Sequence, residues 1–358
     1  MPALKPKVLI VTTYEYGELG KTGSTGEALS WYTNDTLTEF TPVPGMFAGS
    51  FDGVTADGFY EGVFHNAAGD QCLIVSGMGQ NNASCSLMAL GFSDQIDLSE
   101  TYVLVAGIAG GNPNQLSLGS VAWANWVVAG DLANLVAMAE LPPDQFFYPL
   151  FHLGCETPWP TGKDNAGFAT GTEVFPLNQS LAAHAYDLSK DAALVQQSDA
   201  VRAYCAKYDQ PAARGTPSVI RGDSMASNFF FHGNTLANYA EWWMRKWTES
   251  WIAEHPGTAE TRGYFAVTTM EDIAFATAAR RLAQAGRLDA DRLMILRGAS
   301  NFDRPSPGES TMQSLKASDD IEIAFTESLE NLYRAGSVVV KDILGNWDRW
   351  KDGAPKEG

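Results

Sequence analysis

The chain has 358 residues, of which 45% are hydrophobic and 18% charged, so it can bury a large core and is too apolar to be disordered over most of its length. Its formal net charge is −18, from 42 acidic and 24 basic residues, and a field of this sign repels phosphate groups and anionic lipid surfaces. Nucleic acids and membrane surfaces are therefore poor partners for this protein.

No segment approaches the roughly 18–20 uncharged apolar residues that a membrane-spanning helix needs. The longest apolar stretch, residues 118–130, contains Asn125 and ends before Asp131. These features exclude an integral transporter and predict a soluble protein without membrane insertion. The first residues lead straight into a strand with no apolar signal region, so we expect a cytoplasmic protein, or a secreted or periplasmic one if a signal peptide has been removed.

The first half of the chain alternates between strand and helix patterns. Strands are predicted at 8–12, 71–76, 102–106 and 120–128, and a small-residue helix at 82–90. The apolar run at 102–106 is typical of a strand covered on both faces, and a glycine-rich turn is predicted to follow it at 107–111. Residues 142–181 have little periodicity and many Pro, Gly and aromatic residues, so we expect a long ordered insertion there.

The second half continues the alternation. The patterns predict strands at 219–221, 264–268 and 293–297, helices at 238–253, 272–285 and 321–335, and a loop at 298–303. No repeat or linker divides the chain, which favours one α/β domain over residues 1–358 with a mostly parallel sheet and helices on both faces. In such sheets ligands bind at the carboxyl ends of the strands.

A glycine-containing loop at residues 77–82 follows a strand and opens a helix, with Asp97 about 20 residues on. This resembles a dinucleotide-binding fingerprint, but Asn82 stands where the third glycine belongs and the loop does not follow the first strand. We favour a tight turn that presents backbone N–H groups to another ligand. A dinucleotide oxidoreductase is kept as an alternative.

Met270 and Glu271 lie where a predicted strand passes into a helix. One carboxylate can accept hydrogen bonds from both hydroxyls of a ribose diol, while a thioether packs on the apolar face of the sugar. The alternative is that Glu271 only complements the helix dipole. Similarly, the glycines at 107–111 either allow close approach of a ligand or only form a strand-end turn.

Three other candidates also have structural alternatives. Asn301 and Asp303 occupy a predicted loop, where both residue types are common. Asp223 follows a strand and precedes Met225 and the aromatic run at 229–232, which either packs in the core or stacks on a flat base.

The four cysteines lack metal-ligand spacing, so no metal site is expected.

Taken together and in this order, several segments resemble the nucleoside phosphorylase and nucleosidase superfamily and, within it, the purine nucleoside permease family. The segments are SGMGQNNA, LVAGIAGG followed by LGSV, RGDS, TTMEDIAFATA, GASNFDRPSPG and ILGNWDRW. They span about residues 8 to 350. The resemblance implies a single domain with a central mixed, barrel-like β-sheet flanked by helices, a purine nucleoside site at the strand ends and a homo-oligomer.

The resemblance also assigns roles to residues of this chain. Met270 and Glu271 match the ribose-binding pair, and Asn301 matches the position that contacts the imidazole edge of the purine. Met225 departs from the superfamily, which often places a base-stacking aromatic residue there. The turn beneath the sugar matches Gly107, Ile108, Ala109 and Gly110.

The expected reaction is cleavage of the N-glycosidic bond, with no cofactor and with phosphate as a co-substrate only if the protein is a phosphorylase. Phosphorylases of the superfamily generally hold phosphate with arginines, yet Val105 stands at one such position and no arginine precedes Arg202. Losing a guanidinium–phosphate contact favours hydrolysis. Glu15 and Glu18, just after the first strand, are the predicted bases that activate water.

The amide of Asn301 replaces the carboxylic acid of adenosine-type members. An amide cannot protonate the base, but it can donate hydrogen bonds to a 6-oxopurine, so we expect a preference for inosine and guanosine. Asp303 or a water would then supply the proton. A non-catalytic nucleoside-binding protein that serves uptake is the main alternative.

Overall fold

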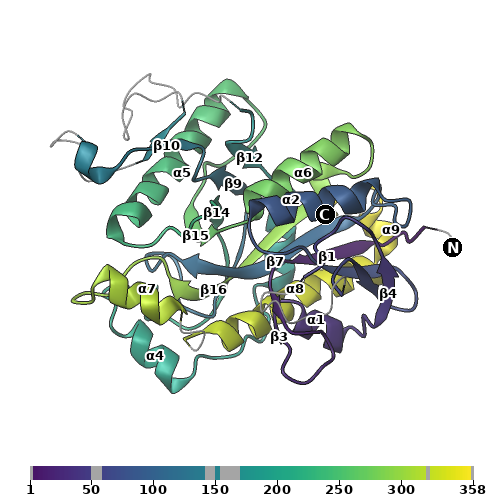
Figure 1. Cartoon of the computed structure of the whole chain (residues 1–358), viewed down its shortest axis with the longest axis horizontal. Helices are drawn as coiled ribbons and strands as arrows, with labels where there is room; N and C mark the ends of the chain where they lie inside the picture. Colours follow the sequence, from purple (N-terminus) through teal and green to yellow (C-terminus); the bar gives the residue numbers. More distant parts are fainter. Residues whose placement is uncertain (1–2, 50–58, 142–149, 154–169, 320–322, 356–358) are drawn as a thin grey trace.

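The computed structural model describes residues 3–49, 59–141, 150–153, 170–319 and 323–355. The strands are β1 (Val8–Thr12), β2 (Glu15–Tyr16), β3 (Thr25–Gly26), β4 (Glu39–Pro42), β5 (Gly62–His65), β6 (Gln71–Val75), β7 (Tyr102–Gly111), β8 (Val121–Trp123), β9 (Trp126–Ala129), β10 (Ala133–Leu135), β11 (Leu150–His152), β12 (Val174–Pro176), β13 (Val219–Arg221), β14 (Asp223–Ala226), β15 (Phe265–Thr269) and β16 (Leu293–Phe302). The α-helices are α1 (Leu29–Asn34), α2 (Gln80–Phe92), α3 (Gln179–Ser189), α4 (Asp199–Cys205), α5 (Asn234–Glu254), α6 (Asp272–Gln284), α7 (Thr311–Asp319), α8 (Phe325–Gly345) and α9 (Trp347–Trp350). Figure 1 shows their arrangement.

Strands from both halves of the chain form one mixed twelve-stranded sheet. Its main path is β12-β9-β14-β15-β7-β1-β6-β5-β4, and β16 pairs with both β7 and β8. Since β8 and β9 follow each other within residues 121–129, the pairs β7–β16, β16–β8, β9–β14, β14–β15 and β15–β7 form a ring. The predicted mixed, barrel-like sheet flanked by helices is confirmed.

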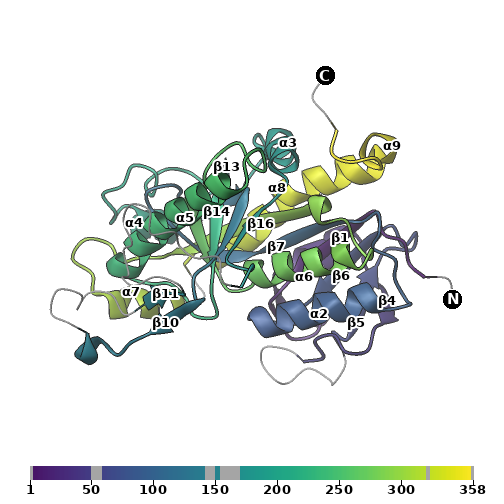
Figure 2. The ribbon, with the colours of Figure 1, turned by 90° about the horizontal axis from the view of Figure 1, so that it is seen from above.

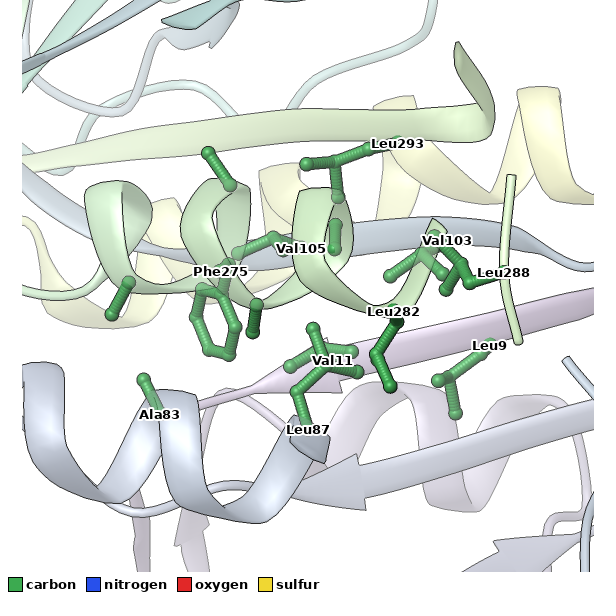
Figure 3. Close-up of a cluster of buried hydrophobic side chains, with 14 of the residues drawn as sticks. Leu9, Val11, Ala83, Leu87, Val103, Val105, Phe275, Leu282, Leu288 and Leu293 are labelled. Carbon is green, nitrogen blue, oxygen red and sulfur yellow. The ribbon is translucent and has the colours of Figure 1, made fainter. Parts of the chain in front are cut away.

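Helices cover both faces of the strands that start the fold, as Figure 2 shows for α2 and α6 on one side and α8 on the other. Because side chains alternate between the faces of a strand, Leu9 and Val11 of β1 pack with α2 and α6. Ile10 instead belongs to the cluster that includes α8. In Figure 3, Val11 lies next to Leu87 of α2 and Leu282 of α6, and Leu9 lies on the other side of Leu282. The apolar first strand therefore anchors two hydrophobic layers.

Two glycine-containing segments that were predicted as a turn and a loop are strands. Residues 107–111 belong to β7 and residues 298–302 to β16, because these strands pair in parallel from Leu293 opposite Val103 to Phe302 opposite Gly111. Glycine is needed at position 107 for packing, since a Cβ there would lie against the Arg297 guanidinium. These segments therefore extend the paired part of β7 and β16.

Other boundaries also differ from the predictions. The expected strand 120–128 is divided into β8 and β9, and the last long helix extends from Phe325 to Gly345. Most of the expected insertion at 142–181 lies outside the described residues, but its described parts include β11, β12 and the start of α3. Within the described ranges, no helix is long and apolar enough to cross a membrane.

Candidate functional site

A cavity of about 400 Å³ opens where the ends of β1, β6, β7, β15 and β16 come together. Its lining combines backbone, hydroxyl, carboxylate, amide and apolar groups, from Thr13, Tyr14, Glu27, Met78, Ile108, Ala109, Gly110, Phe230, Thr268, Thr269, Met270, Glu271, Ser300, Asn301, Leu315, Ile323 and Phe325. A larger groove of about 770 Å³ lies between α6 and the start of α3, and none of the predicted site residues lines it. The smaller cavity is therefore the candidate site.

The cavity brings together predicted residues that are far apart in the sequence. Met270 and Glu271 enter it from the end of β15, Asn301 from β16, and Ile108 to Gly110 from β7. Gly107 lies behind the wall, where it makes room for Arg297. The three matched segments thus meet at one place, as the strand-end argument predicts.

Glu271 is held at the start of α6 by contacts that fix its carboxylate. It occupies the position before the first helical residue, yet its side chain does not cap that helix. Instead, Oε1 accepts a hydrogen bond from Gly79 N at 3.0 Å, and Oε2 accepts one from Arg297 Nη2 at 3.2 Å. Burial raises the pKa of Glu271, and the charge of Arg297 opposes this shift. The turn at residues 77–79 therefore presents a backbone N–H to Glu271.

Glu27 is a second buried carboxylate in the cavity wall, and the sequence reasoning missed it. Its Oε2 accepts hydrogen bonds from the backbone N–H groups of Thr13 at 2.7 Å and Tyr14 at 3.2 Å. Its Oε1 accepts one from Ile108 N at 2.7 Å. Burial raises the pKa of Glu27, while Arg297 and these hydrogen bonds lower it. A carboxylate after Gly26 carries no motif, so only the fold reveals it.

Arg297 lies behind the cavity wall, where it contacts Glu271 directly and acts on Glu27 through its charge. Its guanidinium is buried and donates to Asp272, to Glu271 and to the carbonyl oxygen of Ile108. Burial acts to lower the pKa of Arg297, but the charges of Asp272, Glu271 and Glu27 together raise it. One cation therefore faces three carboxylates, which leaves this cluster rich in negative charge.

Asn301 reaches the cavity because of an irregularity in β16. Ala299 pairs with Ala109 and Asn301 with Gly110, so Ser300 is an extra residue in the ladder. Such a bulge changes the direction of nearby side chains. As a result, the consecutive residues Ser300 and Asn301 both line the cavity.

Neither predicted base lines the cavity. Glu15 is buried in β2, where its Oε2 accepts a hydrogen bond from Ala28 N at 2.9 Å. Its Oε1 is buried with no hydrogen-bond partner among the described residues, and burial raises the pKa of Glu15 to about 8. Glu18 lies in the segment after β2 and is half-buried. Of the three glutamates in this part of the chain, Glu27 lines the cavity and Glu15 and Glu18 do not.

Two more predicted residues, both carboxylates, lie outside the cavity wall. Asp223 is buried and accepts backbone hydrogen bonds from Asn125, Trp126 and Tyr264, so it ties neighbouring strands together. Asp303 is fully buried in an ion pair with Arg304, which occupies its carboxylate.

Met225, at the position where the superfamily often has a base-stacking aromatic residue, also lies outside the cavity wall. Met225 packs in a hydrophobic cluster with Phe231 and Trp243. Phe230, from the aromatic run, lines the cavity, and a Cβ on Gly110 would lie 2.6 Å from its ring. Of the two places that the sequence offered for contact with a flat base, the aromatic run at 229–232 supplies a residue of the cavity wall and Met225 does not.

The fold, with a cavity at the strand ends, is shared with solved nucleosidases. A 5′-methylthioadenosine/S-adenosylhomocysteine nucleosidase from Helicobacter pylori superposes with a TM-score of 0.51, covering 95% of this chain and all of that chain, with 11% identical residues. A family model described as purine nucleoside permease matches residues 5–355. The chain therefore belongs to the purine nucleoside permease family.

Curated relatives have the same family name. A purine nucleoside permease of Candida albicans is 34% identical over 283 residues, which cover 78% of this chain but only 65% of the Candida protein. A probable purine nucleoside permease of Schizosaccharomyces pombe is 27% identical over 351 residues, covering 97% of this chain and 91% of that protein.

Proposed function

We propose that this protein hydrolyses the N-glycosidic bond of purine ribonucleosides and releases the free base and ribose. The observation that carries the proposal is the meeting of Glu27, Glu271 and Asn301 in one cavity. One carboxylate can accept hydrogen bonds from the sugar hydroxyls and the other can activate a water, while the amide can hydrogen-bond to the edge of the base. The cavity volume of about 400 Å³ also fits a ligand of nucleoside size.

Glu271 is the proposed ribose-binding residue. Each carboxylate oxygen has more than one lone pair, so both oxygens can accept a sugar hydroxyl in addition to Gly79 N and Arg297. Met270, the next residue in the wall, provides an apolar surface for the sugar. This pair would hold C1′ in a fixed position for attack.

Glu27 is the proposed general base. Its Oε1 has a single hydrogen bond within the described part of the chain, from Ile108 N, and keeps capacity to bind a water. The water oxygen would attack C1′ while its proton passes to Glu27, and the bond from C1′ to the purine nitrogen breaks. Asn301 would stabilise the departing base by donating hydrogen bonds. With Asp303 engaged by Arg304, a water is the proposed source of the proton that the base takes up.

Water is favoured over phosphate because of the charge of the cavity. Among its described lining residues, none is Lys, Arg or His, and two are buried carboxylates that would repel an anion. Arg297 lies close by, but Asp272 and Glu271 already occupy its guanidinium. Phosphorolysis, with phosphate as co-substrate, is the alternative reaction.

The names of the relatives favour a second candidate function, a non-catalytic nucleoside-binding protein that serves uptake. Such a protein would need Glu271 and Asn301 but no base at Glu27. We also propose that the protein needs no cofactor and forms a homo-oligomer. Light scattering of the purified protein measures the oligomer, and activity after exhaustive dialysis against a chelator tests the need for a cofactor.

Incubation of the purified protein with inosine, with and without phosphate, separates these candidates. Hydrolysis predicts hypoxanthine and ribose in equal amounts at the same rate in both buffers. Accumulation of ribose 1-phosphate, with turnover that depends on phosphate, would establish phosphorolysis instead. Saturable inosine binding without any product would establish the binding protein.

A further inference from the structure

The bulge in β16 places a hydroxyl beside the amide that faces the proposed base. Ser300 Oγ lies 3.2 Å from Asn301 Oδ1 and 3.5 Å from the carbonyl oxygen of Ala109. A hydroxyl has a single proton to donate, and hydroxyl hydrogen bonds weaken quickly beyond about 3 Å. The closer acceptor is the amide oxygen of Asn301.

In the structure, this contact turns Oδ1 of Asn301 toward Ser300. With Oδ1 turned toward Ser300, the NH2 group of Asn301 is the end left for the cavity. Within the described ranges, that NH2 group has no hydrogen-bond partner, although Asn301 lines the cavity. Without the serine hydroxyl, the amide could rotate by half a turn and present its oxygen instead.

The two ends of the amide favour different purines. The NH2 group donates, so it matches the acceptors N7 and O6 on one edge of a 6-oxopurine. A 6-aminopurine has a donor in place of O6, and two donors facing each other leave a buried group unpaired. The orientation of a single amide can therefore determine substrate choice.

We infer that Ser300 is a positioning residue that fixes the amide of Asn301 with its NH2 group toward the base and thereby selects 6-oxopurine nucleosides. The inference rests on the proposed function, because it names the substrate class of that same site. The inference also assigns a role to the bulge in β16, which is to bring Ser300 and Asn301 to the same side of the strand. Without the extra residue, successive side chains of β16 would point to opposite faces, and Ser300 could not share the cavity wall with Asn301.

The test is the ratio of kcat/KM for inosine to kcat/KM for adenosine in wild type, Ser300→Ala and Ser300→Thr. Removing the hydroxyl should lower this ratio about tenfold, since one hydrogen bond between two partly buried side chains at the base is lost. Ser300→Thr keeps a hydroxyl and should keep the ratio within about twofold of wild type. A ratio that is unchanged in Ser300→Ala, or that falls equally in Ser300→Thr, would overturn the inference.

Ser328→Ala is a matched control. Ser328 on α8 also donates its hydroxyl to β16, to the carbonyl oxygen of Ala299 at 2.8 Å, but it does not line the cavity. Its loss should lower the melting temperature and leave the ratio unchanged. A ratio that falls as far in Ser328→Ala would attribute the effect to a loosened β16 and contradict the role of Ser300.

Failure of the proposed function gives a different result from failure of this inference. If wild type neither binds nor cleaves either nucleoside, the proposed function fails and the role of Ser300 fails with it. If wild type cleaves inosine and Ser300→Ala keeps the wild-type ratio, only the role of Ser300 fails.

Discussion

Arg297 and Arg304 are close in the sequence but lie in two separate clusters of buried charged residues. One cluster borders the cavity and the other does not. Arg297 contacts Asp272 and Glu271, and its cluster faces the cavity through Glu271 and Glu27. Arg304 contacts Asp303 and Glu241 away from the cavity wall. Each cluster pairs one arginine with an aspartate and a glutamate, so the two have the same residue types. Access to a cavity, and not burial or pairing, distinguishes the proposed reactive carboxylates from those that stabilise the fold.

The comparison predicts that variants of the first cluster affect turnover or substrate binding and that variants of the second affect stability. Glu27→Gln should have the largest effect on turnover. Losing a general base lowers kcat by roughly 100- to 10,000-fold, while KM for inosine should change only a few-fold. Steady-state kinetics with inosine measure both, and Glu18→Gln, outside the cavity wall, is the control. Wild-type turnover in Glu27→Gln would contradict the role of Glu27.

The pH profile tests the same carboxylate. Glu27 must be ionised to take a proton, and burial raises its pKa. Turnover should therefore fall as the pH is lowered through this raised pKa, at a higher pH than for an exposed glutamate. The profile of kcat against pH in wild type checks the direction.

Glu271→Gln should have the next largest effect. An amide still reaches the sugar but presents only one acceptor oxygen, and it leaves Arg297 with one fewer partner. We expect kcat/KM for inosine to fall roughly 100-fold, mostly through KM, because lost hydrogen bonds to a charged group weaken binding by about 1.5–3 kcal/mol each. Calorimetric titration with inosine should show the weaker binding. Unchanged affinity would mean that the ribose is held elsewhere.

Asp303→Asn should leave turnover within a few-fold of wild type and lower stability. Removing one charge of a buried ion pair destabilises a protein by about 3–5 kcal/mol, and contacts of Arg304 with Glu241 and Asn238 reduce this to the lower end here. Urea unfolding measures the change. A large loss of kcat in a folded Asp303→Asn protein would instead return Asp303 to the reaction as a proton source.

Glu15→Gln should have the smallest effect on turnover, because burial raises the pKa of Glu15 to about 8 and the folded protein keeps this carboxyl protonated near neutral pH. In the unfolded chain the pKa is about 4.3. Between these values the unfolded state loses the proton first, so Glu15 makes the folded state less stable as pH rises, by at most about 1.4 kcal/mol per pH unit. Urea unfolding at pH 5 and pH 8 should show a weaker pH dependence in Glu15→Gln than in wild type. An equal dependence would contradict this assignment.

Sequence patterns predicted much of the fold and part of the candidate site. Apolar runs located β1, β6, β15 and β16, and motifs placed Met270, Glu271 and Asn301 in the cavity. Glu27 could not be found in this way, because its partner Ile108 N is 81 residues away and neither segment has a local signal for the contact.

The end of β16 is a second place where sequence patterns could not predict the site, here for two residues that are close in the sequence. Residue type and periodicity alone did not separate Asn301 from Asp303, because both are polar residues of a predicted loop. In the structure, Asn301 lies beside a bulge and faces the cavity, whereas Asp303 follows the last residue of β16 and pairs with Arg304. A bulge depends on how two strands pair, which residue periodicity alone does not specify.

Hydrolysis of inosine in ¹⁸O-labelled water, with the ribose analysed before its anomeric oxygen exchanges with the solvent, tests the central claim most directly. Wild-type protein in phosphate-free buffer should release hypoxanthine and ribose, with one ¹⁸O atom in the ribose, and Glu27→Gln should release neither at a comparable rate. Ribose 1-phosphate formed only when phosphate is added, or inosine that is bound and recovered intact, would contradict the account of Glu27 as the base that activates water.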